Sequence, residues 1–533
     1  MRRLRIGIID FVSKRPNRSI WARLMHANLA SIMPQVVGAW CEEMGHDVKF
    51  MCYTGLEDFS KELPEDIDLL FIGAFTQAAQ FAYALSNLYR QRGVVTVLGG
   101  PHARCYPDDA QKYFDYVVGF ADKAVIEEVL GECVSRPEMG KFLSSPGQPA
   151  ELPGVRARWK FIEPTLAKAP SRLKCVPMLA SLGCPYTCNF CIDSVVDFQQ
   201  LDYDHIREDL RFLSSRVPNA WVGWHDPNFG VRFKELMNAV ESGMEGGNLS
   251  FAAESSLSLL SESHVKRLSA ARFKVLLPGI ESWYTLGNKS KTGNTQGVEK
   301  VEKVSDHVNM LLAHVPYVQT NFVLGLDCDE GSEPFELTKM FIDKTPGAFP
   351  GYSLLSAFGE AAPLNLELQR AGRVLPFPFH FLNNNHAMNV RPKNYDWPDF
   401  YDRIIDLTKY SFSLRNIMRR ARATQRGFAS WMNIARAVSS EGYGRIKYFS
   451  TVRRLLDTDR SMRRFFDGET TDVPSFFVDL IKKDLGPFWD YLPPGALEHD
   501  ANAYSRKTPS EAPPIEISAR GSGAASPSPG VAS

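Results

Sequence analysis

The chain has 533 residues, with 61 basic and 61 acidic side chains, so its formal net charge is zero. This length exceeds one ordinary hydrophobic core and predicts about three domains. The balanced charge excludes a global attraction to nucleic acid or to membranes, so any such partner must be recognised through a local patch. Nine cysteines, an odd number with one tight cluster, indicate a reducing cytosol rather than a disulfide framework.

The N-terminal residues predict no targeting segment. The apolar run Ile6–Ile9 is short and ends at Asp10, which fits neither a signal peptide nor a transmembrane span. We therefore expect a cytoplasmic protein that has no transmembrane segment and binds no nucleic acid.

Residues 1–133 alternate short apolar runs with helical patterns. Strands are predicted at 4–10, 46–53, 68–74, 94–99 and 116–119, and helices at 29–40, 78–92 and 107–114. Pro34 marks either a kink or a late start of the first helix. The alternation predicts an α/β fold that begins with a doubly wound, Rossmann-like parallel sheet. Ligands of such sheets bind at the carboxyl ends of the strands, where the loops at 75–77 and 99–102 lie.

The alternation resumes after a segment rich in Pro, Gly and Ser at 134–172, which predicts a linker. Residues 173–375 contain six further strands, predicted at 176–182, 220–224, 249–253, 273–280, 317–326 and 351–358. Six strand–helix units predict a partial (β/α)6 barrel, whose chemistry would sit at the carboxyl ends of its strands.

Three cysteines follow the first strand of this predicted barrel. Cys184, Cys188 and Cys191 occupy a short polar loop, from which their thiolates can converge on one metal cluster. Three ligands for four irons leave one iron open, which is what distinguishes a catalytic metal site from a structural one. A structural zinc loop is the alternative, and it would need a fourth ligand nearby. We interpret Cys175, nine residues upstream at the start of a strand, as a packing residue.

The Cys-x3-Cys-x2-Cys pattern, with Phe190 before the last cysteine, resembles the signature of the radical S-adenosylmethionine (SAM) enzymes. In addition, Leu98–His102 and Gly45–Val48 resemble the cobalamin-binding domain that precedes the barrel in many of them. The Asp-x-His-x-x-Gly motif of other cobalamin proteins does not follow the first strand. The resemblance therefore implies cobalamin without a histidine ligand from that motif, and a domain that binds nothing is the alternative.

The resemblance also implies site residues. The cysteines 184, 188 and 191 would hold a [4Fe–4S] cluster. Phe190 would stack on the adenine of SAM. Asp226 would supply the negative charge that a Gly-Gly-Glu triplet usually supplies. Glu254 and Ser255 would contact the ribose or the amino-acid moiety of SAM. Cobalamin would lie against Thr76, Gly99, Gly100 and His102. The paired glycines would let the backbone approach a flat ligand, and His102 is either a ligand or a loop-packing residue.

Residues 376–498 predict a mainly helical region, with helices at 399–408 and 415–436 and a tail at 499–533 that is disordered beyond residue 509. The segment Val374–Met388 is a candidate lining for the open side of the barrel. Within it, His380 and His386 predict a capped loop, with a metal site as the alternative. Basic residues exceed acidic ones between 415 and 464. This excess predicts a solvated face, or a docking surface for an anionic substrate, an acidic electron donor or a membrane.

Together, these resemblances imply a cobalamin-dependent radical SAM enzyme that methylates an unactivated carbon of a metabolite or natural product. A flavodoxin or ferredoxin would supply the electron. A radical SAM cyclase, oxidase or rearrangement enzyme without methyl transfer is the alternative, and a structural or electron-transfer iron–sulfur protein is the non-enzyme alternative. A lipid, a peptide, a tetrapyrrole and a small natural product all remain open as substrates.

Overall fold

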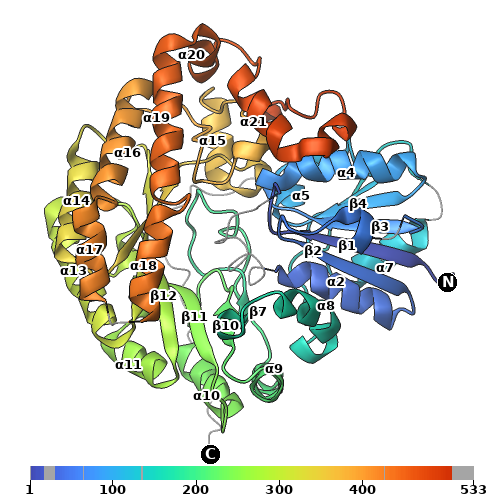
Figure 1. The fold of residues 1–533 in the computed structure, drawn as a ribbon, viewed down its shortest axis with the longest axis horizontal. Helices are drawn as coiled ribbons and strands as arrows, with labels where there is room; N and C mark the ends of the chain where they lie inside the picture. The colour runs from blue at the N-terminus through green and yellow to red at the C-terminus, as the bar shows by residue number, and fades with distance from the viewer. Residues whose placement is uncertain (1, 17–29, 64, 134–135, 425–426, 507–533) are drawn as a thin grey trace, which may run out of the picture.

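The structure is a computed structural model that describes residues 2–16, 30–63, 65–133, 136–424 and 427–506. Figure 1 shows a first parallel sheet in blue on the right and a second in green and yellow on the left. Orange helices of the C-terminal region lie along the left side and the top. The predicted α/β fold with C-terminal helices is therefore confirmed.

The first sheet has the strand order β2-β1-β3-β4-β5-β6, and all its pairs are parallel. Its strands are β1 (Arg5–Phe11), β2 (Asp47–Tyr53), β3 (Leu69–Gly73), β4 (Val95–Gly99), β5 (Tyr116–Val118) and β6 (Lys141–Leu143). Helices cover both faces: α2 (Ile32–Glu43), α4 (Ala79–Gln91), α5 (Pro101–Cys105), α6 (Pro107–Ala110) and α7 (Lys123–Glu132).

Side chains of β1 alternate between two hydrophobic cores. Ile6 and Ile8 belong to the core shared with α2 and α7, whereas Ile9 and Phe11 belong to the core shared with α4. This period of two explains why the strand is apolar throughout, because both of its faces are buried. Helix α2 begins at Ile32, so Pro34 lies in its first turn, where its missing N–H costs no intrahelical hydrogen bond. Leu29, which we predict on this helix, lies outside the described residues.

The predicted linker is more ordered than its composition suggests. It contains β6, which pairs with β5 and extends the first sheet, and α8 (Val155–Ala167), whose Phe161 packs against Phe50 of β2. The boundary predicted at residue 133 therefore cuts the first sheet. Three-residue strands are too short to show a period of two, which is why the sequence pattern missed β6.

The second sheet has the order β14-β13-β12-β11-β10-β7, again all parallel, and it is open between β7 and β14. Its strands are β7 (Cys175–Met178), β10 (Trp221–Trp224), β11 (Ser250–Ser256), β12 (Phe273–Glu281), β13 (Tyr317–Leu324) and β14 (Phe349–Leu354). The connecting helices are α9 (Tyr203–Arg216), α10 (Phe233–Gly243), α11 (Glu262–Ala270), α12 (Gly287–Ser290), α13 (Gly297–His314) and α14 (Glu333–Lys344). These strands are the six predicted for the partial barrel.

The C-terminal region contains α15 (Pro363–Arg370), α16 (Trp397–Ser411), α17 (Leu414–Ala423), α18 (Phe428–Val438), α19 (Tyr443–Thr458), α20 (Arg460–Phe466) and α21 (Ser475–Leu485). The single helix predicted at 415–436 is wrong, because α17 and α18 are separate and Gly427 has a φ of 107°. The predicted disordered tail from residue 509 lies outside the described residues. In the part of the chain that the structure describes, no helix is both long and apolar enough to span a membrane.

The two sheets face each other across the loop that carries the three cysteines (Figure 1). Arg104 of α5 donates to the backbone oxygen of Ile192 in that loop, at 2.8 Å. Tyr106 donates to the oxygen of Ala357, which follows β14, at 3.0 Å. The carboxyl ends of both sheets therefore border one region of the molecule.

Candidate active site at the cysteine loop

The cysteine loop is closed at its base by a short antiparallel pair. Strand β8 (Ser181–Leu182) precedes the cysteines and pairs with β9 (Gln199–Gln200), which follows them. Gly183 has a φ of 66°, and a Cβ there would collide with the backbone oxygen of Asp197. Because only glycine fits this position, the neck of the loop can stay narrow.

Backbone hydrogen bonds set the turns between the cysteines. The N–H of Cys191 donates to the oxygen of Cys188 at 2.9 Å, and the N–H of Asp193 points at the Cys191 sulfur at 3.4 Å. An N–H directed at sulfur stabilises a thiolate or a metal-bound sulfur. Burial raises the pKa of all three thiols, that of Cys191 to about 11. These buried thiols gain most from a bound metal, which replaces the proton on sulfur.

The three cysteines line one cavity of about 340 Å³ at the carboxyl end of the second sheet. This volume matches a pocket for one ligand of drug size. The cavity is lined by polar side chains from the strand ends together with an apolar rim, including Phe190, Asn228, Glu254, Ser255, Glu281, Lys289, Asn321, Leu354, Phe358 and Asn384.

A buried ion pair lies beside the cysteines. The Lys289 ammonium is 2.6 Å from Oε1 of Glu281, and both side chains are largely buried. Burial lowers the pKa of Lys289, but the charge of Glu281 and the nearby Cys188 outweigh it, so this pKa is raised and the lysine stays charged. Gly279 makes room for the pair, because a Cβ there would meet Oε1 of Glu281. The cavity therefore holds a fixed positive charge near the thiols.

Phe190, Glu254 and Ser255 of the predicted SAM contacts line this cavity with the cysteines. Burial raises the pKa of Glu254, and Lys289 opposes that rise. The Ser255 hydroxyl is already used, because it donates to the backbone oxygen of Phe229 at 2.8 Å. Phe190 and Glu254 are thus the better placed of the three to contact a ligand.

Asp226 lies outside the cavity lining. Its carboxylate accepts from the N–H of Ala180 at 3.1 Å and from the Ser181 hydroxyl at 2.6 Å, directly before the cysteine loop. Burial raises its pKa to about 6. In this structure the Asp226 carboxylate anchors the base of the loop through Ala180 and Ser181.

The cavity also contains residues to which the sequence assigned no role, among them Asn228, Asn384 and Lys289. Asn228 accepts from the N–H of Ser256, and its buried Nδ2 has no hydrogen-bond partner within the described chain. Asn384 has a φ of 60°, and its buried Oδ1 likewise has none there. Lys289 lies in a four-residue helix. The predicted lining segment Val374–Met388 supplied a signal for Asn384, but short turns carry no period that would reveal Lys289.

The alternative metal sites fit the structure less well than the cysteine loop. Cys175 begins β7, at the strand end opposite to the loop, so it is not the fourth ligand that a zinc site would need. His380 contacts Asp484 at 2.9 Å, and His386 contacts the side chain of Asn383. Among the described residues, no three His, Cys, Asp or Glu side chains surround a single point for a metal ion. Cluster cysteines need not do so, because each binds a different iron.

The carboxyl edge of the first sheet carries the residues that are predicted to contact cobalamin. Among the described residues, and apart from its two chain neighbours, no atom lies within 4 Å of the position that a Cβ would take on Gly99. Gly100 has a φ of 93°, and its Cβ would lie 3.0 Å from the oxygen of Ala74. Gly100 is therefore required by backbone packing, whereas Gly99 leaves room for a ligand.

His102 and Thr76 are both buried at this edge. Nε2 of His102 is 2.6 Å from the Tyr83 hydroxyl, which donates to Asp109 at 2.8 Å. Burial lowers the pKa of His102 to about 3, so the ring is neutral. The burial of His102 favours its predicted packing role over that of a ligand, although its Nδ1 has no hydrogen-bond partner among the described residues.

The facing sheets and the three-cysteine loop form the fold of the cobalamin-dependent radical SAM enzymes. No family model matches the chain. The solved structure of the cobalamin-dependent S-adenosylmethionine radical enzyme OxsB, with aqua-cobalamin bound, superposes with a TM-score of 0.55 at 9% identity. The alignment covers 92% of this chain and 80% of that one. The resemblance that the cysteine pattern predicts is confirmed.

Two proteins of known activity are related to this chain in sequence. The bacteriochlorophyllide d C-12(1)-methyltransferase of Chlorobaculum tepidum is 25% identical over 368 residues, covering 67% of this chain and 78% of the relative. The C-8(2)-methyltransferase of the same organism is 25% identical over 312 residues, covering 55% of this chain and 66% of that relative. Both relatives are methyltransferases, so the chain resembles enzymes in sequence as well as in fold.

Proposed function

We propose that this chain is a cobalamin-dependent radical SAM methyltransferase that acts on an unactivated carbon of a small molecule. The observation that carries the proposal is the cavity, which is lined by all three cysteines and borders the region between the two sheets. The two methyltransferases among its relatives support methyl transfer over other radical outcomes.

The residues fit the three cofactors in distinct places. Cys184, Cys188 and Cys191 would hold the [4Fe–4S] cluster, and Phe190, Asn228 and Glu254 would surround SAM in the cavity. Cobalamin would approach the first sheet at Gly99, where the described residues leave space for a side chain. When bound, these groups supply a 5′-deoxyadenosyl radical and a transferable methyl group, chemistry that no side chain provides.

The protein contributes position, charge and exclusion of water. Asp226 fixes the start of the cysteine loop through Ala180 and Ser181. Lys289 offsets negative charge at the cysteines, and Glu281 holds the lysine in place. Apolar side chains such as Leu277, Val323 and Phe358 border the same cavity and reduce the access of water to reactive species.

The first substrate class to test is the cyclic tetrapyrrole, because both relatives act on bacteriochlorophyllide d. The cavity of about 340 Å³ is close to the lower limit for one ligand, so only the reacting edge of a macrocycle would enter beside SAM. A flavodoxin or ferredoxin would deliver the electron in the cytoplasm.

The decisive experiment uses the chain reconstituted with iron and sulfide under anaerobic conditions, with hydroxocobalamin, a reductant, methyl-labelled SAM and bacteriochlorophyllide d. Methyl transfer predicts 5′-deoxyadenosine and S-adenosylhomocysteine in about equal amounts, with label in the product. A cyclase or oxidase would give substrate-dependent deoxyadenosine without matching S-adenosylhomocysteine, and that result would overturn the proposal. Tetrapyrroles with other side chains extend the panel if bacteriochlorophyllide d does not react.

A further inference from the structure

An apolar and basic surface lies on α17 and α18, far from the cysteine loop. The structure exposes twelve large hydrophobic side chains among its described residues, and half of them fall between residues 414 and 443. Leu414 is 71% exposed and Val438 is 57% exposed. We call this surface the α17–α18 face, and it comprises Leu414, Met418, Trp431, Ile434, Val438 and the adjoining Tyr443.

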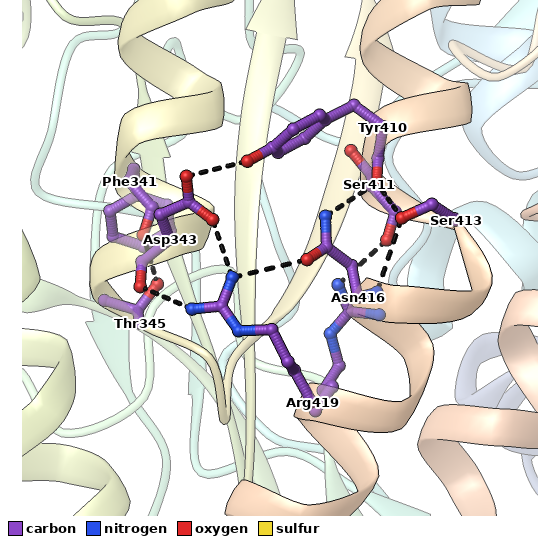
Figure 2. A network of polar contacts seen from close by, with 9 residues as sticks. Phe341, Asp343, Thr345, Tyr410, Ser411, Ser413, Asn416 and Arg419 are labelled. Carbon is purple, nitrogen blue, oxygen red and sulfur yellow. Dashed lines mark hydrogen bonds and ion pairs between the residues drawn. The ribbon is translucent and has the colours of Figure 1, made fainter.

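The inner sides of both helices are fixed to the barrel. Figure 2 shows Arg419 of α17 bonded to Asp343 at the end of α14, at 2.7 Å, with Tyr410 of α16 donating to the same carboxylate. Asn416 joins this network by donating to the backbone oxygen of Tyr410 at 2.8 Å (Figure 2). Polar contacts thus connect α17 to α14 and α16 on its inner side, opposite to its exposed apolar side chains.

The same helices cover the amino-terminal end of the second sheet. Phe428 of α18 packs on Trp221 at the start of β10, with ring centroids 4.9 Å apart. Arg436 donates to the Tyr317 hydroxyl at the start of β13, at 2.7 Å. The cofactor cavity lies at the other end of these strands, so the α17–α18 face is separate from it.

Basic residues are in excess over this surface, and Glu441 lies between Val438 and Tyr443 as an acidic neighbour. No Asp or Glu occurs between Leu414 and Val438 in the sequence. Arg415 and Arg422 are exposed on α17, and Leu414, Met418 and Arg422 follow one another at intervals of four residues along one side. Other basic residues of this stretch are used internally: Arg419 pairs with Asp343, Arg436 with Glu441, and Arg420 is buried.

We propose that the α17–α18 face binds peripherally to a membrane surface that contains anionic lipids. Helices that lie in the lipid interface typically expose Trp and Leu together with Arg, as this surface does. Six large apolar side chains exposed on neighbouring helices mark a surface for interaction. A second copy of the chain fits less well, because a two-fold contact would bring Arg415 and Arg422 of both copies to the same interface.

The test is flotation of the full chain with vesicles of phosphatidylcholine alone and of phosphatidylcholine mixed with phosphatidylglycerol. We expect binding to the mixed vesicles, weakening as salt is added. The double variant Arg415→Gln/Arg422→Gln should bind them about fivefold more weakly for each arginine removed. The double variant Leu414→Ser/Val438→Ser should bind about tenfold more weakly. As a matched control, Met139→Ser removes a side chain that is 81% exposed just before β6 of the first sheet, and it should leave binding unchanged.

The result of each measurement either supports or overturns membrane binding by this surface. All five substituted residues are exposed, so the variants should unfold at the wild-type temperature, and vesicle binding can be compared directly. Failure of the wild type to float with either vesicle overturns the proposal. So does equal binding to both vesicles, or equal loss in the Met139→Ser control. A wild-type dimer in sedimentation equilibrium that Leu414→Ser/Val438→Ser converts to monomers, without vesicle binding, would instead assign the surface to a second copy.

Discussion

Two loops follow parallel strands in this chain, and each carries residues that suggest a cofactor. The loop after β4 contains Gly99, Gly100 and His102, and the loop after β7 contains the three cysteines. In the first, two of the three residues serve the protein itself: Gly100 lies against Ala74, and His102 is bonded to Tyr83. In the second, all three cysteines border a cavity.

The difference shows how unequal two sequence signals can be. Glycine and histidine have common packing roles, so a motif made of them does not by itself indicate a ligand. Three cysteines in eight residues that line one cavity have no comparable packing role. The cysteine loop therefore carries the assignment of chemistry, while the cobalamin site depends mainly on the open space at Gly99 and on likeness of fold.

The largest expected effect comes from removing the cysteines. Replacing Cys184, Cys188 and Cys191 together with Ala should reduce the reconstituted iron content from about four per chain to background and abolish formation of 5′-deoxyadenosine. Iron analysis and chromatography of the products measure both. As controls, Cys175→Ala and Cys328→Ala should retain the iron, and a triple variant that still holds the cluster would contradict the assignment.

The next largest effect is expected from breaking the Lys289–Glu281 ion pair. The variant Lys289→Met leaves the Glu281 carboxylate buried without its partner, and we expect it to lower the free energy of unfolding by about 2–3 kcal/mol. It also removes positive charge near the cysteines, so the midpoint potential of the cluster should become more negative. Urea unfolding of the apoprotein and a redox titration followed by electron paramagnetic resonance measure the two effects. Adding Glu281→Gln should restore most of the stability, and a fully additive loss would refute the pairing.

Substitutions of Gly99 and Gly100 should have opposite effects: one should lower stability, and the other should weaken cobalamin binding. Gly100→Ala forces an L-residue to a φ of 93° and should cost about 1–3 kcal/mol of stability. Gly99→Leu meets open space and should leave stability nearly unchanged while weakening retention of hydroxocobalamin. Thermal unfolding and the corrin absorbance after gel filtration test both predictions. If Gly99→Leu retains cobalamin as the wild type does, the ligand does not lie against Gly99.

The smallest effect concerns Asp226 and depends on pH. The pKa of Asp226 is about 6 in the folded state, which is above its value in the unfolded state. The folded protein is therefore stabilised by the protonated carboxyl group below about pH 4. This stabilisation is lost as the pH rises through 6. Asp226→Asn does not titrate, so it should gain about 1–2 kcal/mol relative to the wild type between pH 5 and pH 8. Urea unfolding at the two pH values measures this gain. A difference that is independent of pH would show that the carboxyl group has an ordinary pKa.

Much of the fold could be predicted from the sequence. Strands β10 and β12 lie within one residue of the bounds predicted, because each is a short apolar run with clear ends. Strand β6 and the break between α17 and α18 were missed, because short elements and a single glycine leave little periodic signal. In the site, Phe190 and Glu254 follow from their places on the loop and strand. Lys289 and the anchoring role of Asp226 depend on tertiary contacts between segments distant in sequence.

The most direct test of the account is the electron paramagnetic resonance spectrum of the reduced, reconstituted chain, recorded with and without SAM. If three cysteines hold a four-iron cluster and leave one iron open, SAM should bind that iron and change the spectrum of the reduced cluster. The same spectrum with and without SAM, at saturating SAM and with the iron content intact, would contradict the central claim that this loop generates radicals from SAM.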